Sequence, residues 1–256
     1  MNAPTAVHTV TQTNGGYQLH FSGNRKFVVE KRDITAATTD FIVNAAKPSL
    51  TGGGGVDKAI HQAAGGSLKA SCKKFKKKHG QRCPTGQCRM TQSGRLQSSV
   101  VIHTVGPKLS KGSTSASKRE KQDLYNTYET TLKEAHKLAE HLATKGRTVR
   151  YKHWPMDLTS RDAARLEGHA KNGGCTVTFP SISTGSYSFP KEKACQIATK
   201  AISNYFTSHA RDPYIKEVHL TLPGRSNSQN FNFYKKRFEC IQSKGLQAGL
   251  NKAHPK

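Results

Sequence analysis

Four consecutive glycines, Gly52 to Gly55, stand between a hydrophobic segment and an apolar-periodic one, and this arrangement restricts the fold. Residues 40–43 before them predict a buried strand, and residues 56–64 after them predict a helix. Four amides without side chains can lie against a ligand, and the positive end of the helix faces the same place. The loop therefore predicts a site for an anion such as a phosphate or diphosphate.

Asp57 follows the glycines directly, where its charge would repel a bound phosphate. A carboxylate in this position suggests chemistry or a contact with a sugar hydroxyl. Another explanation requires no ligand, because an acidic residue in the first turn of a helix gains about 0.3–1 kcal/mol from the helix dipole. The residue alone does not decide between the two.

Strands and helices alternate through most of the chain. Expected strands cover residues 17–21, 26–30, 40–43, 100–105, 176–179 and 217–222, and expected helices cover 56–64, 67–75, 124–142, 194–205 and 230–240. This alternation predicts a three-layer α/β/α domain over residues 17–240, with a central mixed, mainly parallel sheet. Residues 1–16 are expected to form a polar N-terminal segment and 241–256 a polar basic tail. Between about 144 and 174 the pattern fails, which suggests a surface insertion.

A second loop rich in small residues, at 181–190, follows the expected strand at 176–179. Ligands of parallel sheets bind at the carboxyl ends of the strands, so this loop and the glycine loop can converge on one crevice. Neither loop has the Gly-Lys-Ser/Thr sequence of a Walker loop or the Gly-x-Gly-x-x-Gly spacing of a dinucleotide-binding fold. An elongated anion held by two sets of amides is the ligand that the pair predicts.

The motifs in their order along the chain resemble a macrodomain. They are Asp33-Ile-Thr35, Ile42-Val-Asn-Ala-Ala46, Gly52-Gly-Gly-Gly-Val-Asp57, Ala59-Ile-His61, Ala63-Ala-Gly65, Val101-Ile-His-Thr-Val-Gly-Pro107 and Phe179-Pro-Ser-Ile-Ser-Thr-Gly185. The resemblance covers roughly residues 20–240 and is strongest to the MacroD-type ADP-ribosyl hydrolases. It implies the three-layer macrodomain fold and ADP-ribose as ligand. We expect no cofactor and no metal.

The resemblance also implies roles for individual residues. Asp33 would accept a hydrogen bond from the adenine amino group with Ile34 beside the ring, although Asp33 could instead cap a turn. Tyr187 would cover the distal ribose, although it could also be a packing lid. Asp57 would position or activate the water that attacks the anomeric carbon. The remaining expected ligand-binding residues are Asn44, Ala45, Gly53, Gly54, Gly55, Val56, Ser183, Thr184, Gly185 and Ser186.

Lys47 departs from the resemblance, since the family usually has an asparagine there that holds a ribose hydroxyl. An ammonium donates but cannot accept a hydrogen bond. Lys47 could pair with Asp57 and weaken it as a proton acceptor, or Pro48 could direct the side chain toward solvent or an anionic substrate. Two smaller departures are Lys58, in place of a glycine, and residues 222–224, where the family often has an aromatic residue near the base.

Three functions are therefore considered. The first is a hydrolase that removes mono-ADP-ribose from acidic side chains or cleaves related ADP-ribose esters. Its catalytic residues would be Asp57 and Lys47, which stands at the usual asparagine position. The second is a non-catalytic reader of ADP-ribose or ADP-ribosylated proteins. The third, as an added property, is salt-dependent binding of RNA or poly(ADP-ribose) through exposed lysines, because the formal charge is +25. Lysines 73, 74, 76, 77, 78, 235 and 236 and Arg237 would supply that surface.

The cysteines and the hydropathy exclude other classes. Six cysteines lack Cys-x-x-Cys spacing and are expected as free thiols, and His79, Cys83 and Cys88 match no standard zinc pattern. No apolar run approaches the roughly 18 residues of a membrane span, and the first twenty residues lack a signal-peptide core. We expect no membrane partner and a cytoplasmic or nuclear location.

Overall fold

The computed structural model describes residues 8–110, 113, 115–146, 158–211, 214–224 and 228–251. The strands are β1 Val10–Thr13, β2 Gly16–Phe21, β3 Arg25–Glu30, β4 Phe41–Ala45, β5 Cys88–Gln92, β6 Val100–Thr104, β7 Cys175–Pro180 and β8 Ile215–Thr221. The helices are η1 Ile34–Ala36, α1 Gly55–Ala64, α2 Gly66–Lys73, α3 Lys118–Lys145, α4 Ser160–Lys171, α5 Lys191–Ser208, α6 Ser228–Lys244 and α7 Leu246–Asn251.

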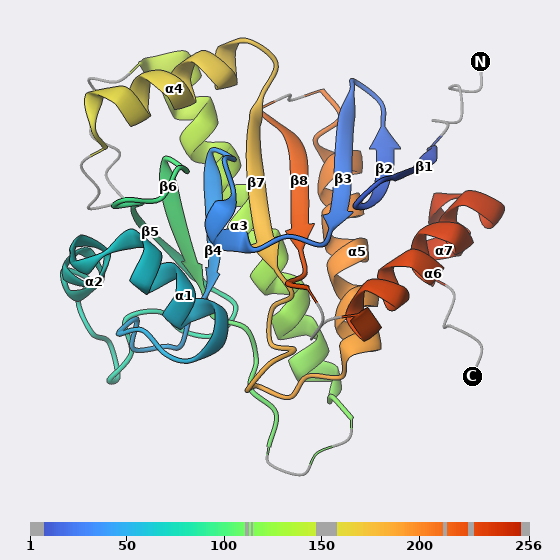
Figure 1. Cartoon of the computed structure of the whole chain (residues 1–256), viewed down its shortest axis with the longest axis horizontal. Coiled ribbons are helices and arrows are strands. Elements are labelled where there is room, and N and C mark those ends of the chain that lie inside the picture. The colour runs from blue at the N-terminus through green and yellow to red at the C-terminus, as the bar shows by residue number, and fades with distance from the viewer. Residues whose placement is uncertain are drawn as a thin grey trace.

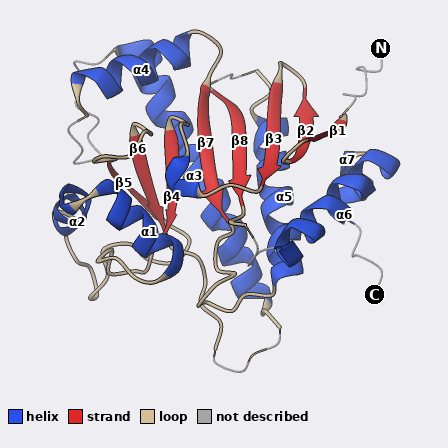
Figure 2. Cartoon of the chain, in the orientation of Figure 1, coloured by secondary structure: helices blue, strands red, loops and turns tan. Residues whose placement is uncertain are grey.

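One mixed sheet passes through the molecule in the order β1-β2-β3-β8-β7-β4-β6-β5 (Figure 1). The central pairs, from β3 through β8, β7 and β4 to β6, are parallel. The pairs β1 with β2, β2 with β3, and β5 with β6 are antiparallel. Helices lie on both sides of the sheet (Figure 2), so the predicted three-layer architecture is confirmed.

The two faces of the sheet bury different side chains because successive residues of a strand point in opposite directions. In β4, Phe41 and Val43 belong to the large core that includes residues of α3, α5, α6 and α7. Ile42, between them, packs with residues of α1 and α2 in a smaller core on the other face. This alternation makes α1 and α2 the covering layer beside the glycine loop.

The middle of the sheet opens at the carboxyl ends of its strands. Strands β4 and β7 pair at only two positions, Phe41 with Val177 and Ile42 with Thr178. The loop after β4 and the loop after β7 therefore leave from strands that have already separated. A crevice between parallel strands that diverge in this way is the usual ligand site of open α/β sheets.

Several elements begin or end differently from the sequence prediction. Strand β5 was not predicted, because its sequence Cys-Arg-Met-Thr-Gln mixes apolar and polar residues without clear alternation. Helix α2 begins at Gly66, one residue before the predicted start at 67, with Gly65 as N-cap. Strand β1 lies within residues 1–16, which were expected to form a polar N-terminal segment.

The predicted surface insertion and the predicted polar basic tail both contain helices. Within residues 144–174, α4 forms and inserts Leu166 and Ala170 into the large core. Within residues 241–256, α6 continues to Lys244, and α7 buries Leu246 and Leu250. Residues 147–157, which include Trp154 and Pro155, lie outside the described residues.

Two further predictions concern thiols and membranes. All six cysteines are free, as predicted, and five of them are buried. In the described part of the chain, no helix combines the length and the apolar character that crossing a membrane requires.

Candidate active site

A cavity of about 180 Å³ lies between the glycine loop and the loop after β7, at the carboxyl ends of the parallel strands. It brings together most of the residues that the sequence predicted as a binding site. Those lining it are Ala45, Lys47, Gly53, Gly54, Gly55, Val56, Asp57, Ser183, Gly185, Ser186 and Tyr187. The predicted convergence of the two loops is therefore present in the structure.

The glycine loop places bare backbone at the start of α1. Gly54 is the N-cap and supplies no side-chain hydrogen bond, so the first amides of α1 are left for solvent or a ligand. Gly52 and Gly55 have φ of 80° and 56°, in the region that favours glycine. At Gly53, a Cβ would stand 2.9 Å from Oδ2 of Asp57, so a side chain there would displace the carboxylate.

The loop after β7 packs closely against Gly106, which follows β6. A Cβ at Gly106 would stand 2.2 Å from Oγ of Ser183 and 2.6 Å from Cγ2 of Ile182. Only a residue without a side chain allows this approach. The loop is closed by bonds from the Phe189 N–H to the Ser183 carbonyl at 3.0 Å and from the Leu109 N–H to the Tyr187 carbonyl at 3.1 Å.

Asp57 is almost entirely buried, with 4% of its surface exposed, yet it lines the cavity. Its Oδ1 accepts a hydrogen bond from Nδ2 of Asn44 at 2.7 Å. Nε2 of His61, one turn along α1, is 3.3 Å from the same oxygen but lacks hydrogen-bond geometry. One carboxylate oxygen is therefore held from behind, while Oδ2 faces Gly53 and the cavity.

Behind Asp57, a chain of polar side chains continues into the protein. Nδ2 of Asn44 also lies 3.0 Å from Nδ1 of His103, and Nε2 of His103 lies 2.9 Å from Oγ1 of Thr91. Burial, with a smaller contribution from His61, lowers the pKa of His103 to about 3, so the ring is neutral. Because Oδ1 of Asp57 accepts the hydrogen bond, the Asn44 amide turns Nδ2 toward it.

This orientation determines the tautomer of His103. Since Nδ2 of Asn44 donates to Nδ1, the single ring proton of His103 is on Nε2 and is donated to Thr91. Asn44 and His103 are register partners on β4 and β6, which explains how two adjacent strands bring them side by side. We call the connected residues Asp57, Asn44, His103 and Thr91 the polar relay.

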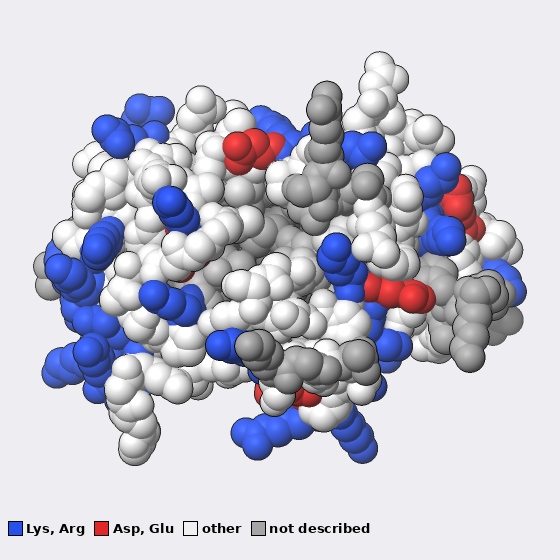
Figure 3. All heavy atoms as spheres, turned by 60° about the horizontal axis from the view of Figure 1, so that its bottom comes forward, with Lys and Arg blue, Asp and Glu red and all other residues white. Residues whose placement is uncertain are grey.

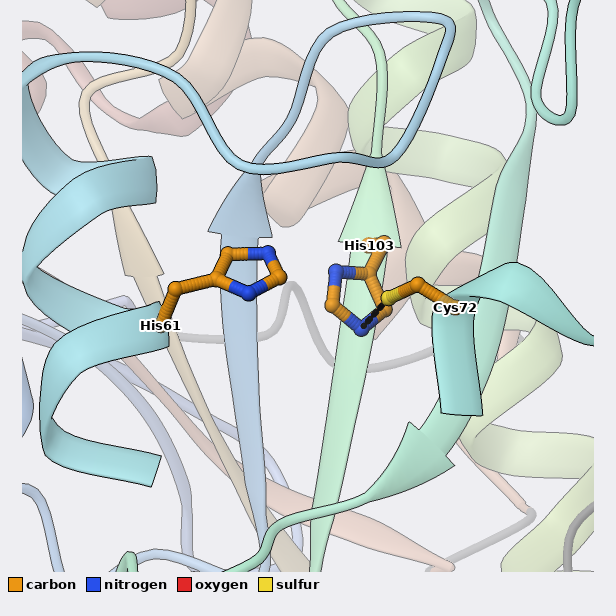
Figure 4. A group of neighbouring side chains, drawn as sticks. All are labelled: His61, Cys72 and His103. Carbon is orange, nitrogen blue, oxygen red and sulfur yellow. Dashed lines mark hydrogen bonds between the residues drawn. The ribbon is translucent and has the colours of Figure 1, made fainter. Parts of the chain in front are cut away.

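His61, Cys72 and His103 lie close enough to suggest a metal site, with one potential ligand atom from each within 4.8 Å of the others. Figure 4 shows them on α1, α2 and β6, with Sγ of Cys72 3.5 Å from Nε2 of His103. The protonated Nε2 and the Nδ1 occupied by Asn44 leave His103 no lone pair for a metal. Burial, and then Asp57, raise the pKa of Cys72 to about 12, so its thiol keeps its proton. The donor set fits a hydrogen-bonded cluster better than a metal centre.

Lys47 lines the cavity, and hydrogen bonds hold the backbone that follows it. The segment after it is anchored where Arg82 and Cys83 donate backbone N–H groups to the Pro48 carbonyl at 2.9 and 3.1 Å. Among the described residues, the Lys47 ammonium has no ion pair within 4.0 Å, so the predicted alternative in which it pairs with Asp57 is not observed. The second alternative, with Lys47 directed toward solvent or a substrate, agrees with this arrangement.

Other predicted binding residues lie apart from the cavity. Asn44 is fully buried behind Asp57 and does not line the cavity, so its structural role is in the polar relay. Asp33 caps η1, its Oδ1 accepting from the N–H and hydroxyl of Thr35, both at 2.9 Å. Ile34 is buried against the smaller core, and the Thr184 hydroxyl donates to the Ser181 carbonyl. Their contact with a ligand remains a prediction.

Tyr187 lines the same cavity as Asp57. Burial, and then the charge of Asp57, raise the pKa of the Tyr187 phenol. The hydroxyl therefore keeps its proton at neutral pH and can donate a hydrogen bond.

Sequence reasoning assigned no role to His61, His103 or Thr91. A weak signal for His61 exists, since it stands four residues after Asp57 and so on the same side of a helix. His103 and Thr91 gave no comparable signal, because their partners are on other strands.

Comparison with known proteins identifies the family of this chain. The family model described as Macro domain matches residues 43–198. An O-acetyl-ADP-ribose deacetylase of Escherichia fergusonii is 36% identical over 200 residues, which are 78% of this chain and 89% of that protein. An O-acetyl-ADP-ribose deacetylase of Escherichia coli is 38% identical over 182 residues, or 71% of this chain and 81% of that protein.

Solved structures show the same fold. A macrodomain of Oceanobacillus iheyensis with ADP is 26% identical, with a TM-score of 0.63, and the match covers 94% of this chain and 99% of that one. A macrodomain of Trypanosoma brucei in complex with ADP is 25% identical, with a TM-score of 0.58, and the match covers 82% and 67% of the two chains. The fold is that of a three-layer α/β/α domain with a cavity at the carboxyl ends of its parallel strands. The chain belongs to the macrodomain family.

Proposed function

We propose that this chain binds ADP-ribose in the cavity between its two loops and hydrolyses esters of the distal ribose. The substrates would be mono-ADP-ribosylated acidic side chains and O-acetyl-ADP-ribose-type esters. The observation that carries the proposal is Asp57, whose Oδ1 is fixed by Asn44 while Oδ2 faces the cavity between the loops. The names of the relatives and the ADP in the solved structures support it.

In this proposal the two loops bind the diphosphate and Asp57 activates the water. Amides at the start of α1 and in residues 183–186 hold the diphosphate, because a helix N-terminus favours negative charge. Oδ2 of Asp57 accepts a proton from a water molecule, and the water oxygen attacks the anomeric carbon as that carbon develops positive charge.

A single carboxylate is sufficient for this reaction. When the modified group is an acidic side chain, the bond from the anomeric carbon to its oxygen breaks and releases a carboxylate. That leaving group needs no proton, in contrast to the alcohols released by glycosidases that use two carboxyl groups. Asp57 is the only carboxylate among the described residues that line the cavity.

The decisive variant is Asp57→Asn, which keeps the shape of the side chain and removes its charge. We expect ester hydrolysis to fall by about 100-fold or more, measured on O-acetyl-ADP-ribose and on a Glu-linked ADP-ribosylated protein. Calorimetry should still detect ADP-ribose binding. Hydrolysis at the native rate by Asp57→Asn would overturn the catalytic part of the proposal.

The second candidate function is a reader that binds ADP-ribose without turnover. Lys47 favours it, because an unpaired ammonium on the cavity wall can attract the diphosphate but cannot accept a hydrogen bond from a ribose hydroxyl. Calorimetric binding without turnover on either substrate would support the reader. Absence of ADP-ribose binding would overturn both functions.

A further inference from the structure

A second cavity, about 560 Å³ in volume, lies on the outer side of the glycine loop. We call it the outer groove, and Gly52, Gly53, Lys58, His61, Gly65 and Lys69 are among its lining residues. Gly53 lines both cavities, so the two cavities share a wall at this glycine. The ring of His61 lies beneath Gly52, where a Cβ would be 3.7 Å from it. The outer groove therefore begins at Gly53, and Asp57 lies next to this glycine in the first cavity.

Two lysines line the outer groove, and one arginine lies beside a glycine of its lining. Lys58 projects from α1 and Lys69 from α2, and both are exposed. Arg95 is also exposed, and its guanidinium lies against Gly65, where a Cβ would be 3.1 Å from Nε. None of the three has an ion pair within 4.0 Å among the described residues. Their charges are available to a partner.

The sequence around the outer groove contains almost no compensating charge. From Phe41 to Arg119 the single acidic residue is Asp57, which is buried and faces the first cavity. Figure 3 shows the face at the carboxyl ends of the strands, where Lys and Arg gather on the side of α1 and α2 and acidic residues are sparse. A concave surface of one sign concentrates ligands of the opposite sign.

The position of the outer groove indicates which anion it meets. A group attached to the distal ribose beside Asp57 has to leave the first cavity, and the outer groove continues from their common wall at Gly53. Single-stranded nucleic acids are usually held by exposed aromatic rings on which bases stack. The lining has no Phe, Tyr or Trp, and the His61 ring lies under the loop. An extended acidic polypeptide satisfies both observations.

We propose that the outer groove binds the acidic polypeptide on either side of an ADP-ribosylated Asp or Glu, so that the protein selects modified sites in acidic surroundings. The proposal rests on the proposed hydrolase function, whose substrate class it narrows. Exposed ion pairs are individually weak, so three cations acting together should provide about tenfold selectivity. That selectivity should decrease as salt screens the charges.

The experiment compares kcat/KM for two Glu-linked ADP-ribosylated peptides, one flanked by glutamates and the other by serines, with O-acetyl-ADP-ribose as a substrate that has no peptide. The test variant is Lys58→Glu/Lys69→Glu. The matched control is Lys145→Glu/Lys200→Glu, which makes the same charge change at exposed lysines of α3 and α5, on the opposite side of the sheet. Each rate is measured at about 50 mM and about 300 mM salt.

We expect the native protein to prefer the glutamate-flanked peptide by about tenfold at low salt. The test variant should lose this preference, and the control should keep most of it, while O-acetyl-ADP-ribose turnover stays within about twofold in all three. An equal loss of preference in test and control variants would overturn the proposal. So would retention of the preference by the test variant, or competition by a single-stranded RNA oligonucleotide that outmatches a polyglutamate peptide.

Failure of the proposed function has a different signature. If the native protein turns over none of the three substrates, hydrolysis is excluded, and fluorescence anisotropy of the two labelled peptides then tests the outer groove by binding alone. A tenfold affinity difference that disappears in Lys58→Glu/Lys69→Glu supports the groove, and equal affinities overturn it.

Discussion

Nδ2 of Asn44 lies 2.7 Å from Oδ1 of Asp57 and leaves the second oxygen of that carboxylate directed toward the cavity. Asn44→Leu keeps a similar side-chain volume and removes this donor. We expect kcat for O-acetyl-ADP-ribose to fall by about 100-fold, because the proton acceptor loses its fixed orientation. ADP-ribose affinity, measured by calorimetry, should change by less than about threefold, since Asn44 does not line the cavity. Unchanged kcat would show that Asn44 has no effect on Asp57.

Thr91 accepts the only proton of the His103 ring in the polar relay, at 2.9 Å. Thr91→Val should leave that buried N–H without its nearest acceptor and lower the free energy of unfolding by about 1–3 kcal/mol. Urea denaturation measures the change. Thr91→Ser is the control, because it restores the hydroxyl and should recover most of the loss.

Gly106 permits the close approach of Ile182 and Ser183 beneath the second loop. Gly106→Ala should push the loop away and weaken ADP-ribose binding by at least about tenfold, since a Cβ would clash with both side chains. Gly168 in α4 is a suitable control, because a Cβ there meets nothing within 4 Å. Gly168→Ala should preserve binding. Equal affinities for the two variants would show that the loop adapts without cost.

His219 bridges two carboxylates, with Nδ1 3.2 Å from Glu30 and Nε2 3.1 Å from Glu217. Burial alone would lower the pKa of His219, but the hydrogen bonds to Glu217 and Glu30 raise it above its usual 6.5. The bonds to His219 lower the pKa of Glu30 and Glu217 below 4.5.

The direction of these shifts determines the pH dependence. The contribution of His219 is complete below about pH 6.5 and is lost as the pH rises through its higher folded-state pKa. The contribution of the carboxylates is present above about pH 4.5 and is lost as the pH falls through their lower values. His219→Gln should therefore destabilise the protein more at about pH 5.5 than at about pH 8.5, by roughly 1 kcal/mol in urea denaturation. A pH-independent difference would contradict the assignment.

Lys47 stands on the cavity wall without an acidic partner among the described residues. Lys47→Asn should weaken ADP-ribose binding by about threefold to tenfold through loss of charge. The same variant should increase kcat, because an amide can accept as well as donate a hydrogen bond to the distal ribose. A decrease in both quantities would show that Lys47 itself takes part in the reaction.

The sequence was informative where local chemistry decides the structure. The apolar run of β4, the glycines and Asp57 predicted strand, loop and helix, because each signal is contained within a few residues. The apolar stripe of α3 predicted its length less well than its position, since the capping box at Ser117 and Glu120 starts the helix earlier. Strand β5 gave no such signal, and its place depends on pairing with β6.

Only part of the candidate site could be predicted, because only part of it is formed by residues close together in the sequence. The loop residues could be found because glycines and small residues in sequence supply adjacent amides. The polar relay could not be found, because Asn44, His103 and Thr91 come from three strands whose register is not encoded locally. Side chains that contact one another across neighbouring strands can be identified only when the order and register of the strands are known.

Because β4 and β7 pair at only two positions, the two loops that follow them are attached to different parts of the sheet. One loop is attached to the half of the sheet that contains β4, β6 and β5, and the other to the half that contains β7, β8 and β3. Changes in the length of either loop can therefore alter the width of the crevice without moving the side chains that hold the two halves together. The site can evolve toward larger or smaller substrates while the stability of the domain stays the same.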